Sequence, residues 1–331
     1  MKSVLVTGSD IDESYLSRLR DAGFEVHNPT QDLTEDELIE ELRGKHAYLL
    51  GGLERATAGA LESADELELV AFLGVGYESF VATDVATRRG IAVTNTPGAM
   101  VTSVAEMTIG LMLSLTRKIT WMNGRLKQGL EASPGKSSDL RGRTAGIVGL
   151  GAIGAQVARI LTTAFGMNVI YFSRTPKPQL ESDLGISYAP LDELLRSADV
   201  ISLHVPTTAE TTPLIGDKEL VRMKETAILV NTARAEVVEP GALRKALESR
   251  SIAGAAYDGY YIEPLPSPKD DPHGLLSLAD DVFIVTPHVA SLTHGSWNGM
   301  SELAVESIES FFANGTSDRI VNPDYTQHRA K

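Results

Sequence analysis

Three residues in the second half of the chain, Arg234, Glu263 and His288, carry side chains that could together reduce a 2-keto acid. An imidazole titrates near neutral pH, so His288 could give a proton to the carbonyl oxygen. A carboxylate beside the ring, such as Glu263, favours the protonated form and fixes its orientation. A guanidinium can hold the substrate carboxylate and favours negative charge that develops on oxygen. Taken singly, the three also fit a loop histidine, a surface glutamate and an arginine at a strand end.

Each of these residues follows a segment that is predicted to be a strand. The apolar segments are 227–231, 254–258 and 282–285. Strands alternate with helices along this part of the chain, which predicts a parallel sheet. The carboxyl ends of parallel strands lie at one edge of the sheet, where ligands of such folds bind. We therefore expect the three side chains to meet at that edge.

The glycines of the segment 144–154 are typical of a dinucleotide-binding turn. Residues 145–148 predict a buried strand, and the apolar pattern after the glycines predicts a helix. In that context Gly149 permits a tight turn, Gly151 lets the backbone approach a pyrophosphate, and Gly154 lets helix and strand pack closely. The N-terminus of the helix offers free N–H groups to phosphates. The alternative is a glycine-rich turn without a ligand.

The residues after the next predicted strand, 168–172, indicate which dinucleotide is preferred. NAD-binding proteins place Asp or Glu about 20 residues beyond the glycines, where it binds the ribose 2′-hydroxyl. This chain has Ser173, Arg174 and Thr175 there. A hydroxyl and a guanidinium suit a 2′-phosphate. We therefore predict NADP(H) as the preferred cofactor, with NAD(H) as a possible substitute; a solvated loop arginine is the alternative.

Two α/β units are predicted to position these residues. Strands alternate with helices through about the first 95 residues, which form one doubly wound unit. An apolar helix is predicted over 101–123, with both of its faces buried. The second unit starts at Thr144. A closing helix, 299–312, could return to the first unit, which would make that unit discontinuous in sequence.

Composition limits the partners that this chain can have. The net charge is −14, from 44 acidic and 30 basic residues, which argues against nucleic acid or an anionic membrane as a partner. The chain has no cysteine, and its histidines show no metal-ligand spacing, so we predict no disulfide and no metal. The start of the chain does not have the pattern of a signal peptide, and the apolar segment 104–115 is too short to span a bilayer. A cytoplasmic protein is expected.

Together these motifs make the chain similar to the D-isomer-specific 2-hydroxyacid dehydrogenases, over residues from about Leu69 to Ala304. The resemblance implies an α/β fold of two doubly wound parallel-sheet domains. A Rossmann dinucleotide-binding domain, 100–290, would be inserted in a flavodoxin-like substrate domain, 1–99 plus 291–331. The motifs are Gly74–Tyr77, Arg89–Gly98, Val104–Glu106, Gly146–Gly154, Leu203–Pro206, Asn231–Arg234, Asp258 through Glu263-Pro264, and Thr286–His288.

Matched position by position, the resemblance implies His288 as acid and base, Glu263 as its partner and Arg234 as the residue that orients the substrate. The backbone amides of Val75 and Gly76 would hold the substrate carboxylate, with Arg234 and His288 as further substrate contacts. The crossing helix and the loop after it would build a homodimer, and the cleft between the domains would close by a hinge motion. The implied cofactor contacts are Val104, Gly149, Gly151, Ala152, Ile153, Gly154, Ser173, Arg174, Thr175, Val205, Pro206, Thr211, Thr232, Ala233, Asp258 and Ser291.

Departures from the family pattern bear on the substrate. Ala235 replaces the usual glycine after the arginine, and Glu78 and Val81 alter the substrate loop. Glu263 argues against formate as substrate, and Val75 argues against phosphite. Glyoxylate and hydroxypyruvate are the first substrates expected, and Tyr260 and Tyr261 are expected among the residues that select them. Two alternatives stay open: an NAD(H)-dependent dehydrogenase of a larger or sugar acid, and a non-enzymatic dinucleotide sensor of the corepressor type.

Overall fold

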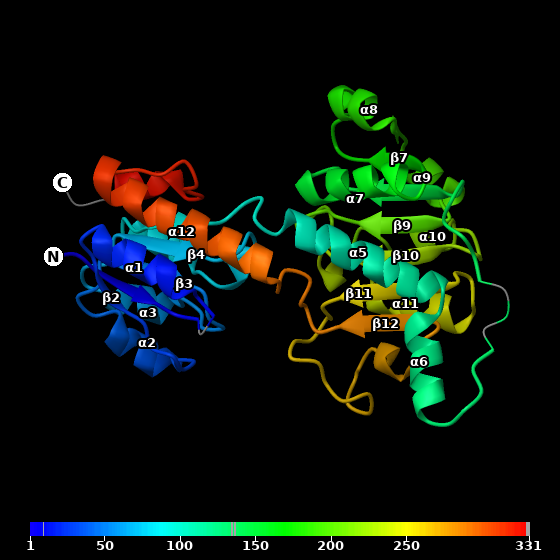
Figure 1. Cartoon of the computed structure of the whole chain (residues 1–331), viewed down its shortest axis with the longest axis horizontal. Coiled ribbons are helices and arrows are strands. Elements are labelled where there is room, and N and C mark those ends of the chain that lie inside the picture. The colour runs from blue at the N-terminus through cyan, green and yellow to red at the C-terminus, as the bar shows by residue number, and fades with distance from the viewer. Residues whose placement is uncertain (9, 134, 136, 329–331) are drawn as a thin grey trace. The chain divides into compact units, whose positions relative to one another are not determined.

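The chain forms two compact units, and the first of them is built from two separate stretches of sequence. Unit 1 consists of Met1–Met100 and Thr293–Lys331, and unit 2 consists of Val101–Leu292 (Figure 1). The computed structural model describes residues 1–8, 10–133, 135 and 137–328. The chain thus begins unit 1, builds all of unit 2, and then returns to unit 1.

A parallel sheet forms the centre of unit 1. Its strands run in the order β2-β1-β3-β4-β5, and neighbouring strands pair in parallel. This order, 2-1-3-4-5, is that of flavodoxin-like folds and confirms the predicted class. The strands are β1 (Ser3–Val6), β2 (Glu25–His27), β3 (Ala47–Leu50), β4 (Leu69–Phe72) and β5 (Ala92–Thr94).

Helices cover both faces of this sheet because side chains alternate along each strand. Val4 and Val6 of β1 belong to an apolar core with residues of α1 and α12, while Leu5 belongs to a second core with residues of α2, α3 and α4. Asp12 caps the start of α1 by accepting from the Ser14 N–H. The helices are α1 (Glu13–Asp21), α2 (Glu35–Glu41), α3 (Ala58–Ser63), α4 (Thr83–Arg88) and α12 (His294–Asn314), with 3-10 turns η1 (Tyr77–Ser79) and η4 (Pro323–Gln327).

A second parallel sheet forms the centre of unit 2. Its strands run in the order β12-β11-β10-β9-β6-β7-β8. Counted within the unit, this is the Rossmann order 3-2-1-4-5-6 with a further strand at the edge, as predicted. The strands are β6 (Thr144–Val148), β7 (Asn168–Phe172), β8 (Ser187–Tyr188), β9 (Val200–Leu203), β10 (Ile228–Asn231), β11 (Gly254–Asp258) and β12 (Phe283–Thr286).

This sheet is also covered on both faces. Residues of α5, α7 and α8 form one apolar core with the strands, and residues of α9, α10 and α11 form the other. Figure 1 shows α5 running across the strands of unit 2. The helices are α5 (Val101–Thr116), α6 (Ile119–Lys127), α7 (Ala152–Thr163), α8 (Pro178–Leu184), α9 (Leu191–Ser197), α10 (Asp217–Leu220) and α11 (Pro240–Glu248), with 3-10 turns η2 (Ala235–Val237) and η3 (Leu275–Ser277).

Two helix predictions need correction. The helix predicted over 101–123 is interrupted, because Lys118 takes a left-handed conformation with φ 53° between α5 and α6. No residue of α6 is buried within the chain. The closing helix predicted over 299–312 begins earlier, at His294, where the Thr293 hydroxyl accepts from the Ser296 N–H. The short elements α8 and β8 were not predicted.

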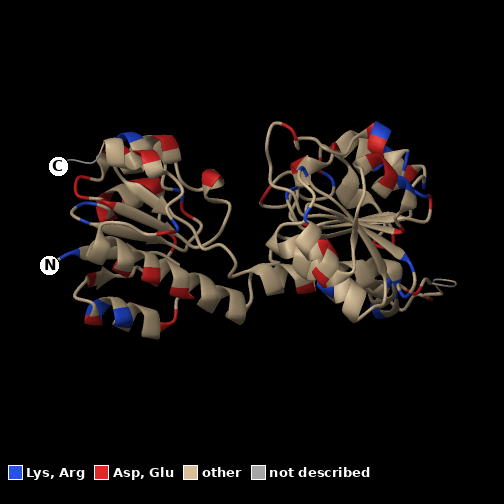
Figure 2. Ribbon diagram, turned by 90° about the horizontal axis from the view of Figure 1, so that it is seen from above, with Lys and Arg blue, Asp and Glu red and all other residues tan. Residues whose placement is uncertain are grey.

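Charged residues lie mainly on the helices and loops, and the strands of both sheets carry few of them (Figure 2). Acidic residues gather on α2, whose sequence is EDELIEE. Within the described ranges no helix combines the length and apolar character needed to cross a bilayer. The charged side chains thus lie mainly outside the two sheets.

Candidate active site

The strands of unit 2 end in register, and this brings the loops with the predicted site residues to one edge of the sheet. Asn231 of β10 pairs with Tyr257 of β11, and the next residue, Asp258, pairs with Thr286 of β12. The loops that follow these strands therefore start side by side. They carry Arg234, Glu263 and His288.

The side chain of Asn231 shapes the loop that carries Arg234. Asn231 is 1 % exposed. Its Oδ1 accepts from the Ala233 N–H at 3.0 Å, and its Nδ2 donates to the carbonyl of Arg234 at 2.9 Å. Because both ends of this buried amide are bonded to the backbone of one short loop, the amide fixes the loop conformation at Arg234.

Asp258 holds the turn that carries His288. One carboxylate oxygen accepts from the Thr286 hydroxyl at 2.6 Å and from the Val289 N–H at 3.0 Å, and the other accepts from the Ala290 N–H at 2.8 Å. His288 itself has φ 57°, a left-handed conformation that residues with a Cβ seldom adopt. The bonds to Asp258 hold the backbone in this strained state, which is a common feature of functional sites.

The three side chains form a hydrogen-bonded line. Arg234 Nη1 lies 3.0 Å from His288 Nε2, and His288 Nδ1 lies 3.1 Å from Glu263 Oε2. A guanidinium can only donate, so Nε2 accepts and the ring is the neutral tautomer with its proton on Nδ1. The carboxylate then accepts that proton's hydrogen bond. The side chains of His288 and Glu263 are 38 % and 44 % exposed, so a small molecule can reach them.

The glycine turn between β6 and α7 has the geometry of a phosphate-binding turn. Gly149 has φ 98°, and a Cβ at Gly154 would lie 2.1 Å from the carbonyl oxygen of Gly149. A Cβ at Gly151, by contrast, would meet no atom within 4 Å among the described residues. α7 starts at Ala152, and no described side chain caps its first turn. Its free N–H groups and the open space at Gly151 suit an anion at the helix N-terminus.

The loop after β7 carries the residues that were predicted to choose the dinucleotide. The Ser173 hydroxyl donates to the carbonyl of Thr175 at 2.7 Å, and Arg174 and Thr175 are exposed. Arg174 also lies near the loop after β9. The pKa of Glu210 in that loop is below its usual value, chiefly because Thr208 donates to it and to a smaller extent because Arg174 is near. The exposed guanidinium of Arg174 thus lies near the carboxylate of Glu210.

A second cation of this region was missed in the sequence. Lys177 Nζ donates to the carbonyl of Leu150, inside the glycine turn, at 2.6 Å. The backbone N–H of Lys177 donates to the hydroxyl of Tyr171 at 2.6 Å, which fixes the end of the loop, where α8 begins. Lys177 stands three residues after Arg174, so a count of cations along this loop could have found it.

Several other expected cofactor contacts form hydrogen bonds with neighbouring residues. Thr108 Oγ1 donates to the carbonyl of Val104 at 2.7 Å and lies 2.8 Å from Thr232 Oγ1. Because the single proton of Thr108 goes to Val104, Thr232 must donate to Thr108. In the loop after β9, the Thr211 hydroxyl donates to the carbonyl of Pro206 at 2.6 Å. Val205 packs partly buried against the core beneath that loop, and Ser291 is half-buried after the turn of His288.

The expected substrate contacts are divided between the two units. Val75 and Gly76 belong to unit 1, where the Val75 carbonyl accepts from Asn95 Nδ2 at 3.3 Å. Tyr260 and Tyr261, expected to select the substrate, send their hydroxyls to Asp271 and to the carbonyl of Val238 inside unit 2. Over the residues that the structure describes, no group of three His, Asp or Glu residues could hold a metal ion.

Comparison with known proteins shows that the chain is similar to dehydrogenases. Residues 109–290, more than half of the chain, match the family model of the D-isomer specific 2-hydroxyacid dehydrogenase, NAD binding domain. A glyoxylate reductase of Korarchaeum cryptofilum is 36 % identical over 341 residues, which cover 99 % of this chain and 98 % of the relative.

Two similar solved structures contain a bound dinucleotide. A D-isomer specific 2-hydroxyacid dehydrogenase from Lactobacillus delbrueckii ssp. bulgaricus, in its NAD complexed form, has a TM-score of 0.80 at 27 % identity and covers 97 % of this chain and 100 % of its own. An acyclic imino acid reductase, Bsp5, in complex with NADPH and D-Arg, has a TM-score of 0.82 at 26 % identity, with 97 % and 100 % covered.

Proposed function

The chain belongs to the D-isomer specific 2-hydroxyacid dehydrogenase family, and we propose that it reduces a small 2-keto acid to the D-2-hydroxy acid with NADPH as its preferred cofactor. It is an NAD(P)-dependent oxidoreductase that acts on the CH–OH group. The observation that carries the proposal is the hydrogen-bonded line of Arg234, His288 and Glu263. Glyoxylate and hydroxypyruvate are the proposed substrates, and the similarity to the glyoxylate reductase of Korarchaeum cryptofilum supports the first of them.

The glycine turn fits the dinucleotide. The free N–H groups of Ala152 and Ile153 and the open space at Gly151 would accept the pyrophosphate. When bound, a reduced nicotinamide supplies the hydride to the carbonyl carbon of the substrate. Val104, Thr232, Asp258 and Ser291 are proposed to line the nicotinamide side, and Val205, Pro206 and Thr211 the adenosine side.

His288 is proposed to move the proton. In its protonated form Nε2 holds the proton that goes to the carbonyl oxygen of the substrate. Loss of that proton leaves the neutral ring with its remaining proton on Nδ1, the tautomer that Glu263 and Arg234 hold here. Glu263 thus stabilises the charged ring and keeps it oriented, while the Arg234 guanidinium binds the substrate carboxylate and stabilises negative charge on the reacting oxygen.

Substrate turnover tests the reaction. Purified protein with NADPH should reduce glyoxylate or hydroxypyruvate, followed by loss of the reduced-nicotinamide absorbance. His288→Ala should lower kcat by about 100-fold or more and leave NADPH binding unchanged, because the proton donor is lost while the glycine turn is intact. Tight NADPH binding without turnover of any 2-keto acid would instead favour a dinucleotide sensor. Turnover restricted to larger or sugar acids would favour the broader dehydrogenase alternative.

The preference for NADPH is supported by three side chains of one loop. Lys177 offers positive charge beside the glycine turn, and Arg174 offers an exposed positive charge. The Ser173 hydroxyl, which donates to the Thr175 carbonyl, would turn to the phosphate. Arg174→Ser should weaken NADPH binding by about tenfold or more and leave NADH binding nearly unchanged, because only NADPH carries the 2′-phosphate. Arg159→Ser, which removes an exposed charge on α7, is the matched control. A wild-type protein that binds NADH more tightly than NADPH contradicts the preference.

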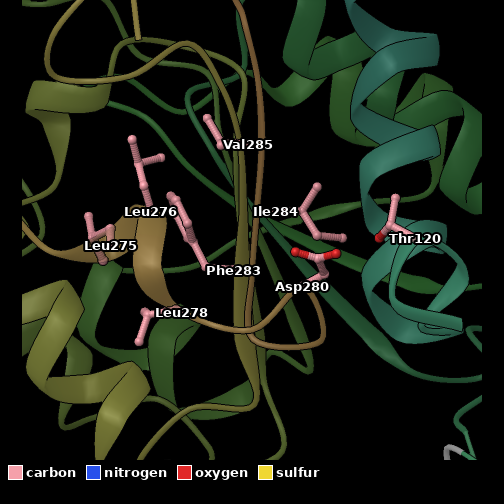
Figure 3. Close-up of a pocket in the computed structure, with 8 residues that line it drawn as sticks. All are labelled: Thr120, Leu275, Leu276, Leu278, Asp280, Phe283, Ile284 and Val285. Carbon is pink, nitrogen blue, oxygen red and sulfur yellow. The ribbon is translucent and has the colours of Figure 1, made fainter. Parts of the chain in front are cut away.

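We also propose that the protein is a homodimer joined through α6. Ile119, Leu126 and Leu130 on and just after this helix are 50 %, 63 % and 45 % exposed. A pocket of about 230 Å³ lies beside Thr120 of α6 and is lined mainly by apolar residues of η3 and β12 (Figure 3). Light scattering should give twice the mass of one chain, and Leu126→Glu should give a single-chain mass. A wild-type protein of single-chain mass would contradict the dimer.

A further inference from the structure

The loop after β11 contains a buried carboxylate that the proposed reaction does not use. Asp271 is 9 % exposed. Its Oδ2 accepts from the Tyr260 hydroxyl at 2.7 Å and from the Leu276 N–H at 3.0 Å, and its Oδ1 accepts from the His273 N–H at 3.0 Å. A buried carboxylate that takes up three donors is a rigid anchor for whatever is bonded to it.

Tyr260 connects this anchor to the site. Its side chain is 3 % exposed and packs in the core of unit 2. At the other end of the same residue, the backbone N–H donates to Glu263 Oε1 at 3.2 Å. The second oxygen of Glu263 is the one that faces His288 Nδ1. One residue therefore touches both the buried carboxylate and the carboxylate that orients the imidazole.

The surroundings of Asp271 keep its carboxylate ionised. Burial opposes ionisation of Asp271, but the donors of Leu276, Tyr260 and His273 together hold its pKa below the usual value. Burial first, and the Asp271 carboxylate next, raise the pKa of Tyr260, so its hydroxyl remains a donor. The ring of His273 lies 6.2 Å from that of Tyr260 and 4.9 Å from that of Tyr261. Because the Asp271 carboxylate stays ionised and the Tyr260 hydroxyl keeps its proton, the hydrogen bond between them is present throughout the neutral pH range.

We propose that Tyr260 and Asp271 are positioning residues that hold Glu263 in the orientation in which it supports His288. The inference rests on the proposed function, because it assigns these residues to that reaction. Glu263 is 44 % exposed, so packing alone leaves its side chain room to rotate. The Tyr260 N–H fixes one of its oxygens, and the Tyr260 hydroxyl fixes the turn that presents this N–H. Loss of the anchor loosens the carboxylate without removing it, and loose positioning lowers the rate of a chemical step.

Two tyrosines allow a comparison. Tyr260→Phe removes the hydroxyl bonded to Asp271, whereas Tyr15→Phe removes a hydroxyl of unit 1 that donates to the carbonyl of Asn298 at 3.0 Å. We expect Tyr260→Phe to lower kcat about tenfold, with the Kd of NADPH unchanged. Tyr15→Phe should leave kcat within twofold. Asp271→Asn should reproduce the loss of kcat, because an amide has only one acceptor end for donors on both sides.

A double-mutant cycle separates positioning from general stability. If Tyr260 acts through Glu263, Tyr260→Phe lowers kcat in the wild-type background but has no further effect on kcat in Glu263→Ala, while its effect on Tm is the same in both. Equal losses of kcat in both backgrounds, or equal kcat for the two tyrosine variants, overturn the inference. A wild-type protein without 2-keto acid reductase activity overturns the proposed function itself, which is a different outcome from an active wild type with an ineffective Tyr260→Phe.

Discussion

Two histidines at strand ends of unit 2 illustrate how surroundings decide what an imidazole can do. His288 stands 38 % exposed between a carboxylate and a guanidinium. His204 follows β9, its Nε2 lies 2.8 Å from the Ser202 hydroxyl, and burial lowers the pKa of His204 to about 4. His204 is therefore neutral at physiological pH, so it has no imidazolium proton to deliver there.

The lowered pKa of His204 predicts a loss of stability in acid. Unfolding returns the ring to a pKa near 6.5, so between pH 6.5 and 4 the unfolded chain binds more protons than the folded one. Stability should then fall by up to about 1.4 kcal/mol for each pH unit as pH decreases through this window. His204→Gln should remove that part of the pH dependence.

Urea unfolding at pH 7, 6, 5 and 4.5 measures the effect. In a Trp297→Phe background the fluorescence of Trp121 reports on unit 2, because the chain has two tryptophans, one in each unit. His294→Gln, an exposed position on α12, is the control and should keep the wild-type slope. An unchanged slope in His204→Gln would assign the acid sensitivity to other groups.

The positions of side chains were predictable from the sequence where they depend on strand ends and not where they depend on contacts between loops. Arg234, Glu263 and His288 could be expected at one edge because each follows a parallel strand. Lys177, Asp271 and Tyr260 could not be placed, since what they do follows from which carbonyl, hydroxyl or carboxylate their loops bring within reach. A pattern of residue types does not specify loop conformation.

At the scale of elements, the apolar pattern predicted the strands of the sheets better than the points at which helices are interrupted. Strands such as Asn168–Phe172 and Gly254–Asp258 agree with their predicted bounds because buried parallel strands are short apolar runs between polar turns. The break between α5 and α6 was missed because Lys118 is not a residue type that favours the left-handed conformation. The ion pair of Lys118 with Asp281, 163 residues away, is a tertiary contact that local pattern cannot show.

The glycine turn allows a prediction that separates folding from binding. In Gly154→Ala the new Cβ would lie 2.1 Å from a backbone carbonyl oxygen, so unit 2 should lose about 3 kcal/mol or more of stability. In Gly151→Ala the new Cβ meets no described atom within 4 Å and the residue has φ −76°, so stability should change by less than about 1 kcal/mol. That methyl group would nevertheless occupy the space proposed for the pyrophosphate.

Urea unfolding and NADPH titration of the two variants test this. Gly151→Ala should unfold at the wild-type urea concentration but bind NADPH about tenfold or more weakly. Gly154→Ala should unfold at a lower urea concentration whether or not the cofactor is present. Wild-type NADPH affinity in Gly151→Ala would place the pyrophosphate elsewhere.

At the scale of the whole molecule, the returning segment completes unit 1. Asn322, 6 % exposed, accepts from the Val93 N–H at 2.7 Å and donates to the Ile91 carbonyl at 2.9 Å and to the Thr87 hydroxyl at 3.0 Å. The Val321 N–H also donates to the Val93 carbonyl at 2.8 Å. One amide side chain thus ties the returning segment to the edge of the sheet at β5.

Loss of this amide should destabilise unit 1 in particular. Asn322→Ala leaves the Val93 N–H and the Ile91 carbonyl without their partners, so the free energy of unfolding of unit 1 should fall by about 2–4 kcal/mol. Unfolding followed through Trp297, in a Trp121→Phe background, measures it. Gln327→Ala, an exposed amide in the same segment, is the control. A fall in the stability of unit 2 of the same size would contradict this assignment.

The discontinuity of unit 1 has a consequence for synthesis on the ribosome. The first stretch emerges with β1–β5, but the face of this sheet that α12 covers stays exposed until Thr293 and the residues after it have been made. At about 5–20 residues per second, translation of unit 2 delays that closure by about 10–40 s. Unit 2 is continuous and can fold during this interval. The nascent chain therefore presents an incomplete apolar sheet surface for many seconds, a natural binding site for a chaperone during translation.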